Sequence, residues 1–106
     1  MDVGGRCVQL CGPVTGRPRA DVEREFAAAR DEMYRHGAAY VYSPPEMVEP
    51  TASHEDAMRD CLRTLTAFAH VLVALPGWER SDGACLEVAV ARAIGVEVVE
   101  LREMVG

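Results

Sequence analysis

The feature that most constrains the fold is the apolar run HVLVAL at positions 70–75, which is followed directly by Pro-Gly. A short, continuous apolar run between turn signals is typical of a strand that is buried on both faces of a sheet. Such strands occur mainly in parallel sheets whose two faces are covered by helices. The run therefore predicts an α/β fold with this segment at the centre of the sheet.

The segments on either side of this run alternate between strand and helix patterns. Shorter apolar segments predict three more strands, at residues 8–11, 38–42 and 96–101. Helical spacing of apolar residues predicts three helices: from an N-cap at Asp21 to a C′ glycine at Gly37, from a capping box at Ser53 and Asp56, and from Gly83 to Gly95. Segment 43–52 is predicted to be an irregular loop. The alternation predicts a small Rossmann- or flavodoxin-like three-layer sandwich, in which a four-stranded parallel sheet has helices on both faces.

Length and charge narrow the functional classes. A chain of 106 residues forms one domain, residues 1–106. Its formal net charge of −6 excludes the basic surface that a nucleic-acid partner would require. No apolar run approaches the roughly 20 residues of a membrane span, and the first residues lack the pattern of a signal peptide. We therefore expect a cytoplasmic protein without nucleic-acid or membrane partners.

The sequence also carries no signature of a metal or a cofactor. The four cysteines, Cys7, Cys11, Cys61 and Cys85, form no CxxC pair and have no zinc-like spacing with the histidines. The glycine-rich segment GPVTG at 12–16 is not a dinucleotide fingerprint, and the chain has no lysine to complete a phosphate-binding P-loop. We expect reduced cysteines, no metal and no cofactor.

Two loops follow predicted strands and are therefore expected at the ligand-binding edge of the sheet. They are GPVTG, after the first strand, and PGWERSDG at 76–83, after the third. Ligands of open parallel sheets bind beyond the carboxyl ends of the strands. A binding site between these loops is the first functional prediction.

Glu87 is the most informative acid, because it lies in a helix of small and aliphatic residues. It shares a helix face with Val90, Ala91 and Ile94. Burying an unpaired carboxylate is costly unless it has a partner, a shifted pKa or a function. The sequence allows two interpretations of Glu87. Glu87 is either an exposed acid stabilised by the helix dipole or a functional group in the cleft.

Asp60 and Ser81 are further candidates for the site, and each also has an ordinary structural interpretation. Asp60 lies opposite the apolar stripe of its helix, which by itself indicates solvated surface. Ser81 is a candidate N-cap, and together with Gly83 it could instead contact a phosphate.

Two arginines and the tryptophan can likewise be interpreted either as ligand-binding or as structural residues. Arg17 and Arg19 are candidates for pairing with a phosphate, although solvated arginines are commoner. Trp78 either stacks on a base or covers the edge of the core. With the loop at 43–52, it is a candidate for base selection.

These motifs together resemble the nucleoside 2-deoxyribosyltransferase superfamily, most closely its short phage and bacterial members, and are related to those of the nucleoside 5′-monophosphate N-glycosidases. The resemblance covers nearly the whole chain. It rests on Gly12-Pro13-Val14-Thr15-Gly16, on Met58-Arg59-Asp60, and on Leu75-Pro76-Gly77-Trp78-Glu79 with Ser81, Gly83, Ala84 and Glu87.

The resemblance implies chemistry at the glycosidic bond of a nucleoside or nucleoside 5′-monophosphate. Glu87 would attack C1′ as the nucleophile, Asp60 would orient or assist it, and a base or water would resolve the glycosyl-enzyme. The first loop, Gly12, Pro13, Thr15 and Gly16, would contact the substrate together with Ser81. Related enzymes complete their pockets across subunits, which implies a homodimer or a higher homo-oligomer. The alternative is a non-catalytic module that binds a nucleotide or a nucleotide-derived signal.

The chain departs from the family pattern at three positions. Cys11 stands where the short members usually have alanine, and His70 takes the place of an aspartate at the start of the third strand. Pro13 replaces a serine that contacts phosphate in the monophosphate hydrolases, which puts that contact in doubt.

Overall fold

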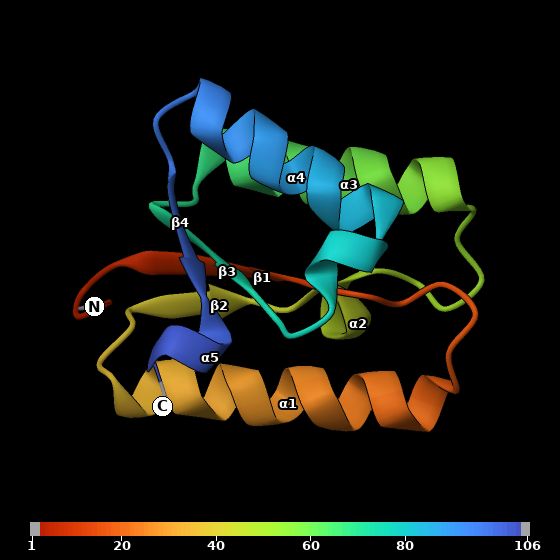
Figure 1. Ribbon diagram of the computed structural model, residues 1–106, viewed down its shortest axis with the longest axis horizontal. Coiled ribbons are helices and arrows are strands. Elements are labelled where there is room, and N and C mark those ends of the chain that lie inside the picture. The colour runs from red at the N-terminus through yellow and green to blue at the C-terminus, as the bar shows by residue number, and fades with distance from the viewer. Residues whose placement is uncertain (1–2, 105–106) are drawn as a thin grey trace.

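The computed structural model describes residues 3–104 (Figure 1). Its strands form one parallel sheet in the order β2-β1-β3-β4. The strands are β1 (Cys7–Cys11), β2 (Tyr40–Tyr42), β3 (Val71–Ala74) and β4 (Glu97–Glu100). The helices are α1 (Arg19–Arg35), α2 (Pro44–Met47), α3 (His54–Ala67), α4 (Asp82–Ala93) and α5 (Leu101–Met104), with a 3-10 turn η1 (Trp78–Arg80).

The sheet is covered on both faces, as the sequence predicts. Helix α1 lies on one face, and α3 and α4 lie side by side on the other (Figure 1). All four residues of β3 are buried, which confirms it as a central strand. The molecule is thus a three-layer α/β sandwich with a four-stranded parallel sheet, the predicted Rossmann- or flavodoxin-like class.

Alternate residues of β1 divide between two hydrophobic clusters. Val8 and Leu10 belong to the cluster under α1, and Cys11 belongs to the cluster under α3 and α4. Because side chains of a strand alternate between the faces of the sheet, Gln9 also faces α3 and α4. This places a buried polar side chain under the helices that form the site.

The predicted start of the first helix is wrong by three residues. Helix α1 begins at Arg19 with Pro18 as its N-cap, and Asp21 lies inside the first turn, where it pairs with Arg24. The amides of Asp21 and Val22 both donate to the carbonyl of Pro18. Proline has a fixed φ that suits a helix start, so Pro18 initiates the turn without a capping side chain.

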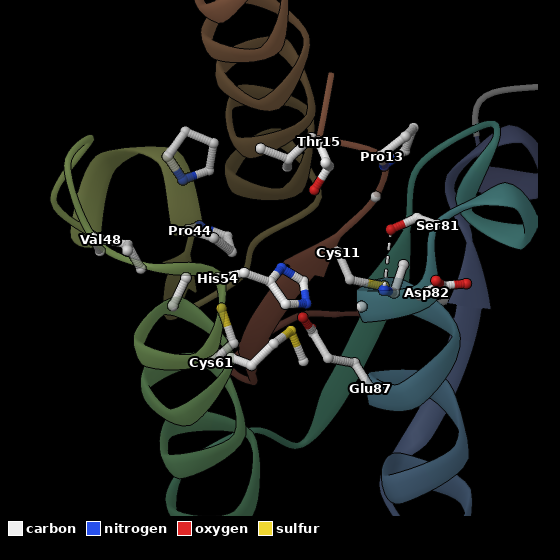
Figure 2. Close-up of a pocket in the computed structure, with 18 of the residues that line it drawn as sticks. Cys11, Pro13, Thr15, Pro44, Val48, His54, Cys61, Ser81, Asp82 and Glu87 are labelled. Atoms are coloured by element: carbon white, nitrogen blue, oxygen red, sulfur yellow. Dashed lines mark hydrogen bonds between the residues drawn. The ribbon is translucent and has the colours of Figure 1, made fainter. Parts of the chain in front are cut away.

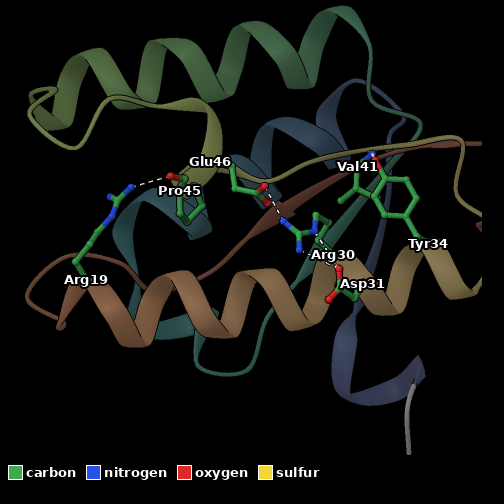
Figure 3. A network of polar contacts seen from close by, with 7 residues as sticks. All are labelled: Arg19, Arg30, Asp31, Tyr34, Val41, Pro45 and Glu46. Carbon is green, nitrogen blue, oxygen red and sulfur yellow. Dashed lines mark hydrogen bonds and ion pairs between the residues drawn. The ribbon is translucent and has the colours of Figure 1, made fainter.

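The segment predicted as an irregular loop contains a short helix. Pro44 and Pro45 occupy the first positions of α2, where their missing amides cost nothing. The helix is tied to α1 by an ion pair of 2.6 Å between Arg30 Nη1 and Glu46 Oε2 and by a hydrogen bond of 2.7 Å from Arg19 Nη2 to the Pro45 carbonyl (Figure 3). These contacts between distant segments place α2 beside the ligand-binding edge.

Several local signals are confirmed. The Ser53 hydroxyl accepts from the Asp56 amide at 3.1 Å, and Gly37 follows α1 with a φ of +90°. Strand β4 ends at Glu100, one residue earlier than predicted, and the chain turns into α5. Within residues 3–104, no helix is long and apolar enough to cross a membrane.

Candidate active site

A pocket of about 710 Å³ opens at the carboxyl ends of β1 and β3. Its walls come from the loop after β1, the residues around α2, the first turns of α3, and the loop and first turns of α4 (Figure 2). The two loops singled out in the sequence meet here, at the edge where open parallel sheets bind their ligands.

Glu87 lines this pocket and is buried, with 5% of its surface exposed. Burial raises the pKa of Glu87 to about 7, and a hydrogen bond from Gln9 acts in the opposite direction. The carboxyl group therefore changes charge near neutral pH. The structure excludes the reading of Glu87 as an exposed acid at a helix edge.

Gln9 is a partner of Glu87 that was not among the predicted site residues. It is fully buried in β1, and its Nε2 donates to the Cys61 carbonyl at 2.9 Å and, over a longer 3.4 Å, to Glu87 Oε2. The amide thus connects α3 to the carboxylate of α4. A buried amide is costly without hydrogen bonds, so a glutamine in an otherwise apolar strand was the available signal.

The first turn of α4 is shaped by Ser81 and Gly83. The Ser81 hydroxyl accepts from the Ala84 amide at 3.2 Å, so Ser81 is an N-cap. A Cβ atom added at Gly83 would lie 3.0 Å from Met58 Sδ, so glycine allows α3 and α4 to approach closely. Both residues also line the pocket, and their contact with a phosphate stays a prediction.

The first loop contributes Gly12, Pro13 and Thr15 to the pocket. A Cβ at Gly12 would lie 2.9 Å from Cβ of Leu75, the residue directly after β3, so glycine allows this loop to pack closely there. Gly16 is not part of the lining. It is exposed and has a φ of +78°, which favours glycine for the turn itself.

The two arginines predicted to bind phosphate are already engaged. Arg17 lies outside the lining, donates to the Pro13 carbonyl at 2.9 Å and pairs with Glu25. Arg19 lines the pocket but bonds to Glu23 and Pro45. Arg80, which was not among the predicted site residues, also lines the pocket, and its side chain makes no hydrogen bond or ion pair within residues 3–104. Its guanidinium is therefore available to a ligand.

Asp60 and Trp78 lie outside the pocket lining. Asp60 Oδ1 accepts from Arg63 at 2.9 Å on the solvent side of α3, and its predicted assistance to Glu87 stays a prediction. The Trp78 indole donates to Glu100 at 3.0 Å and packs against the cluster under α3 and α4. In this structure Trp78 thus covers the edge of the core, which is one of the two roles expected from the sequence.

Most of the chain matches a known protein family. Residues 6–100 match a family described as a domain of unknown function, DUF4406. The chain belongs to the DUF4406 family. No curated protein matches the sequence. The match includes every residue that lines the pocket of this DUF4406 protein, so the pocket lies entirely inside the family domain.

The thiols of the DUF4406 pocket are not reactive groups. Cys11 and Cys61 both line it, but burial raises the pKa of Cys61 to about 12 and that of Cys11 well above its ordinary value. Nucleophilic cysteines require the thiolate, so both side chains act as small apolar groups. Within the described part of the chain, no cluster of three or more His, Cys, Asp or Glu residues is arranged to hold a metal ion.

His54 and the segment around α2 complete the walls of the DUF4406 pocket. His54 is the first residue of α3, and its ring points into the pocket (Figure 2). No periodicity or motif marked His54, whereas Arg80 lies in a loop that the sequence had already singled out. The α2 segment was expected to contribute to base selection, and Pro44, Pro45 and Val48 do line the pocket.

Proposed function

We propose that this protein cleaves the N-glycosidic bond of a nucleoside or nucleoside 5′-monophosphate, with Glu87 as the nucleophile. The observation that carries the proposal is a buried carboxyl group, with a pKa near 7, inside a pocket at the carboxyl ends of the strands. Perturbed acids in such clefts are frequently functional. The motif resemblance to the deoxyribosyltransferase superfamily supports the same residue in the same role.

The contacts of Glu87 suit a nucleophile. Gln9 Nε2 donates to Oε2, while Oε1 makes no hydrogen bond with any residue among 3–104. In the proposed step, the ionised Oε1 attacks C1′, the bond from C1′ to the base nitrogen breaks, and a glycosyl ester of Glu87 forms. Water then releases the sugar in a hydrolase, or a second base accepts it in a transferase.

The pocket also fits the proposed substrate class. Its volume of about 710 Å³ lies within the usual range for small-molecule sites, which is roughly 300–1,000 Å³. Arg80 brings an unpaired cation to the side formed by the loop before α4. This favours a phosphorylated nucleoside over an uncharged one, because guanidinium groups bind phosphate through charge-assisted hydrogen bonds.

The proposal is tested by incubating the purified protein with ribo- and deoxyribonucleosides and their 5′-monophosphates and separating the products by chromatography. The wild type should release free base, and Glu87→Gln should lose this activity. Glu100→Gln is the matched control, because Glu100 is a partly buried acid outside the pocket. Full activity of Glu87→Gln would refute the proposed nucleophile.

A second measurement separates the nucleophile from a bystander. A 2′-fluoro-substituted nucleoside slows breakdown of the glycosyl-enzyme, so mass spectrometry should detect a sugar adduct on the peptide that contains Glu87. Adding a second free base distinguishes the two outcomes of the reaction. A new nucleoside indicates a transferase, and free sugar alone indicates a hydrolase.

The position of Asp60 favours the alternative, a module that binds a nucleotide or a nucleotide-derived signal without cleaving it. The second acid expected from the motif lies outside the pocket and pairs with Arg63. Calorimetry with the same compounds distinguishes the two functions. Saturable binding with the ligand recovered intact after long incubation would favour the binding module.

The proposal includes a homodimer, which the resemblance implies. Tyr40, Met47 and Phe68 are exposed around a second hollow of about 360 Å³ beside β2. Large apolar side chains gathered on a surface are typical of protein contacts. Light scattering should give the mass of two chains for the wild type and of one chain for Phe68→Glu. A monomeric wild type would contradict this part of the proposal.

A further inference from the structure

Cleavage of an N-glycosidic bond requires more than a nucleophile. A purine or pyrimidine leaves poorly as an anion, so a group that protonates the departing base lowers the barrier. The acid expected beside Glu87, Asp60, lies outside the pocket. On the basis of the proposed function, the pocket should therefore contain another proton donor.

The groups that line the pocket leave few candidates. Glu49 and Asp82 are exposed, as His54 is, but an ionised carboxylate only accepts hydrogen bonds and has no proton to donate. Arginine does not give up its proton in proteins. The buried thiols of Cys11 and Cys61 are weak acids, because burial raises the pKa of both. The remaining ionisable side chain is the imidazole of His54, the type most often used to donate and accept protons near neutral pH.

The position of His54 relative to Glu87 follows from contacts on α4. A Cβ atom added at Gly83 would lie 3.9 Å from His54 Cε1, so the ring packs over this glycine. Gly83 and Glu87 are four residues apart and share a helix face. Helical side chains point back toward the N-terminus, which directs Glu87 toward Gly83. Figure 2 shows the His54 ring inside the pocket, with the Glu87 carboxyl group below it.

The ring is also available for such a role. The His54 side chain makes no hydrogen bond or ion pair with the part of the chain that the structure describes. By contrast, His70 Nδ1 accepts from the Cys7 amide, and His36 pairs with Glu32. His54 is itself exposed, but its ring points into the pocket (Figure 2), whereas the ring of an ordinary solvated histidine would point away from the cavity. The orientation of His54 distinguishes it from that case.

We propose that His54 is the general acid and base of the glycosidic reaction. As Glu87 bonds to C1′ and the C1′–N bond breaks, the electron pair stays on the base nitrogen. The His54 imidazolium donates a proton to the base, which leaves neutral. In the second step, the neutral imidazole takes a proton from a water molecule, the water oxygen bonds to C1′, and the Glu87 carboxylate is released.

The experiment compares His54→Gln and His54→Ala with the wild type on whichever compound the wild type cleaves fastest. His36→Gln is the matched control, because His36 is exposed and distant from the pocket lining. We expect kcat to fall by about 10² to 10⁴ in both His54 variants, the usual contribution of general acid–base catalysis, and to stay unchanged in the control. Circular dichroism checks that each variant is folded.

Chemical rescue adds a readout that a structural role would not change. Added imidazole should restore part of the kcat of His54→Ala, whereas pyrazole should not, because it has the same shape but is not protonated near neutral pH. Restoration by both compounds would mean that the ring only fills space, and would overturn the inference. A rise in KM at unchanged kcat would overturn it in favour of a binding role.

The two proposals fail in different ways. If the wild type releases no base and forms no adduct at Glu87, the proposed function fails and the role of His54 fails with it. If the wild type is active and His54→Gln keeps its kcat within about threefold, only the role of His54 is refuted.

Discussion

The two faces of the sheet differ in the side chains that they bury. Under α1, a hydrophobic cluster includes Leu10, Phe26 and Met33. Under α3 and α4, the same strand presents Gln9 and Cys11, and the facing helices bury Glu87 and Cys61. One face thus carries ordinary hydrophobic packing, and the other carries the ionisable groups of the pocket.

This difference indicates that one face of the sheet mainly provides stability and the other carries the functional groups. An apolar cluster stabilises the chain in proportion to the surface that it buries. A buried carboxyl group lowers stability unless it is neutral or paired. The α1 face therefore offsets the cost that the α3–α4 face incurs by burying Glu87. Substitutions on each face test this division between stability and function.

The largest effect is expected on stability, from a cavity in the hydrophobic cluster under α1. Met33 is fully buried there and does not line the pocket. Met33→Ala should lower the free energy of unfolding by about 2–5 kcal/mol, because it leaves a cavity in a packed core. Urea denaturation measures the loss. Binding or cleavage by the folded fraction should be unchanged, and a selective loss of function would contradict the division.

Glu87→Gln tests the cost on the opposite face. The pKa of Glu87 is raised from 4.5 to about 7, so the folded state disfavours the ionised form. The stability that the protonated group allows is fully present below about pH 4.5 and is lost as the pH rises through about 7. Above that pH the wild type carries a penalty of about 3 kcal/mol that the glutamine variant lacks.

The measurement is denaturation of both proteins between about pH 4 and pH 8. The stability of Glu87→Gln relative to the wild type should increase across this range and level off above pH 7. A difference that does not depend on pH would mean that Glu87 ionises without cost in the folded protein.

Gln9→Leu sharpens the comparison within the site. The Gln9 amide donates to the Glu87 carboxylate and lowers its pKa, so removing the donor should raise that pKa further. If ionised Glu87 is the nucleophile, kcat/KM of the wild type rises with pH through about 7. In Gln9→Leu this acidic limb should move up by about one pH unit, the effect of one hydrogen bond to a charged group.

An unmoved limb in Gln9→Leu would show that another group controls the pH dependence. Gln9→Glu is the complementary variant, because it places a second acid beside Glu87 and should raise the pKa of Glu87 as well. Both profiles are read from initial rates across the pH range.

An effect of similar size is expected at Arg80, on the rim of the pocket. Arg80→Ala should raise KM or Kd for nucleoside 5′-monophosphates by about tenfold, the value of one charge-assisted hydrogen bond, and leave nucleosides unchanged. Arg92→Ala is the matched control, because Arg92 is an exposed arginine on α4 that lies outside the lining. Equal effects on both ligand classes would exclude a specific contact with phosphate.

Local and periodic signals in the sequence determined most of the fold. The apolar run before Pro76 predicted β3, the caps at Ser53 and Ser81 marked α3 and α4, and Gly37 marked the end of α1. These features depend on neighbours a few residues away, so they can be read without the tertiary structure. The prediction missed α2, because this short helix is held by Arg19 and Arg30 of α1.

The residues of the site likewise fall into those that the sequence predicted and those that only the tertiary structure identified. The sequence by itself marked Glu87, because an acid in an apolar helix is costly wherever the helix is buried. Only the tertiary structure decided that Gln9 bonds to it, that His54 and Arg80 share its pocket, and that Asp60 and Trp78 do not. The physical reason is that desolvation and hydrogen bonding depend on which side chains meet across the sheet and between helices, and that packing brings together residues far apart in the chain.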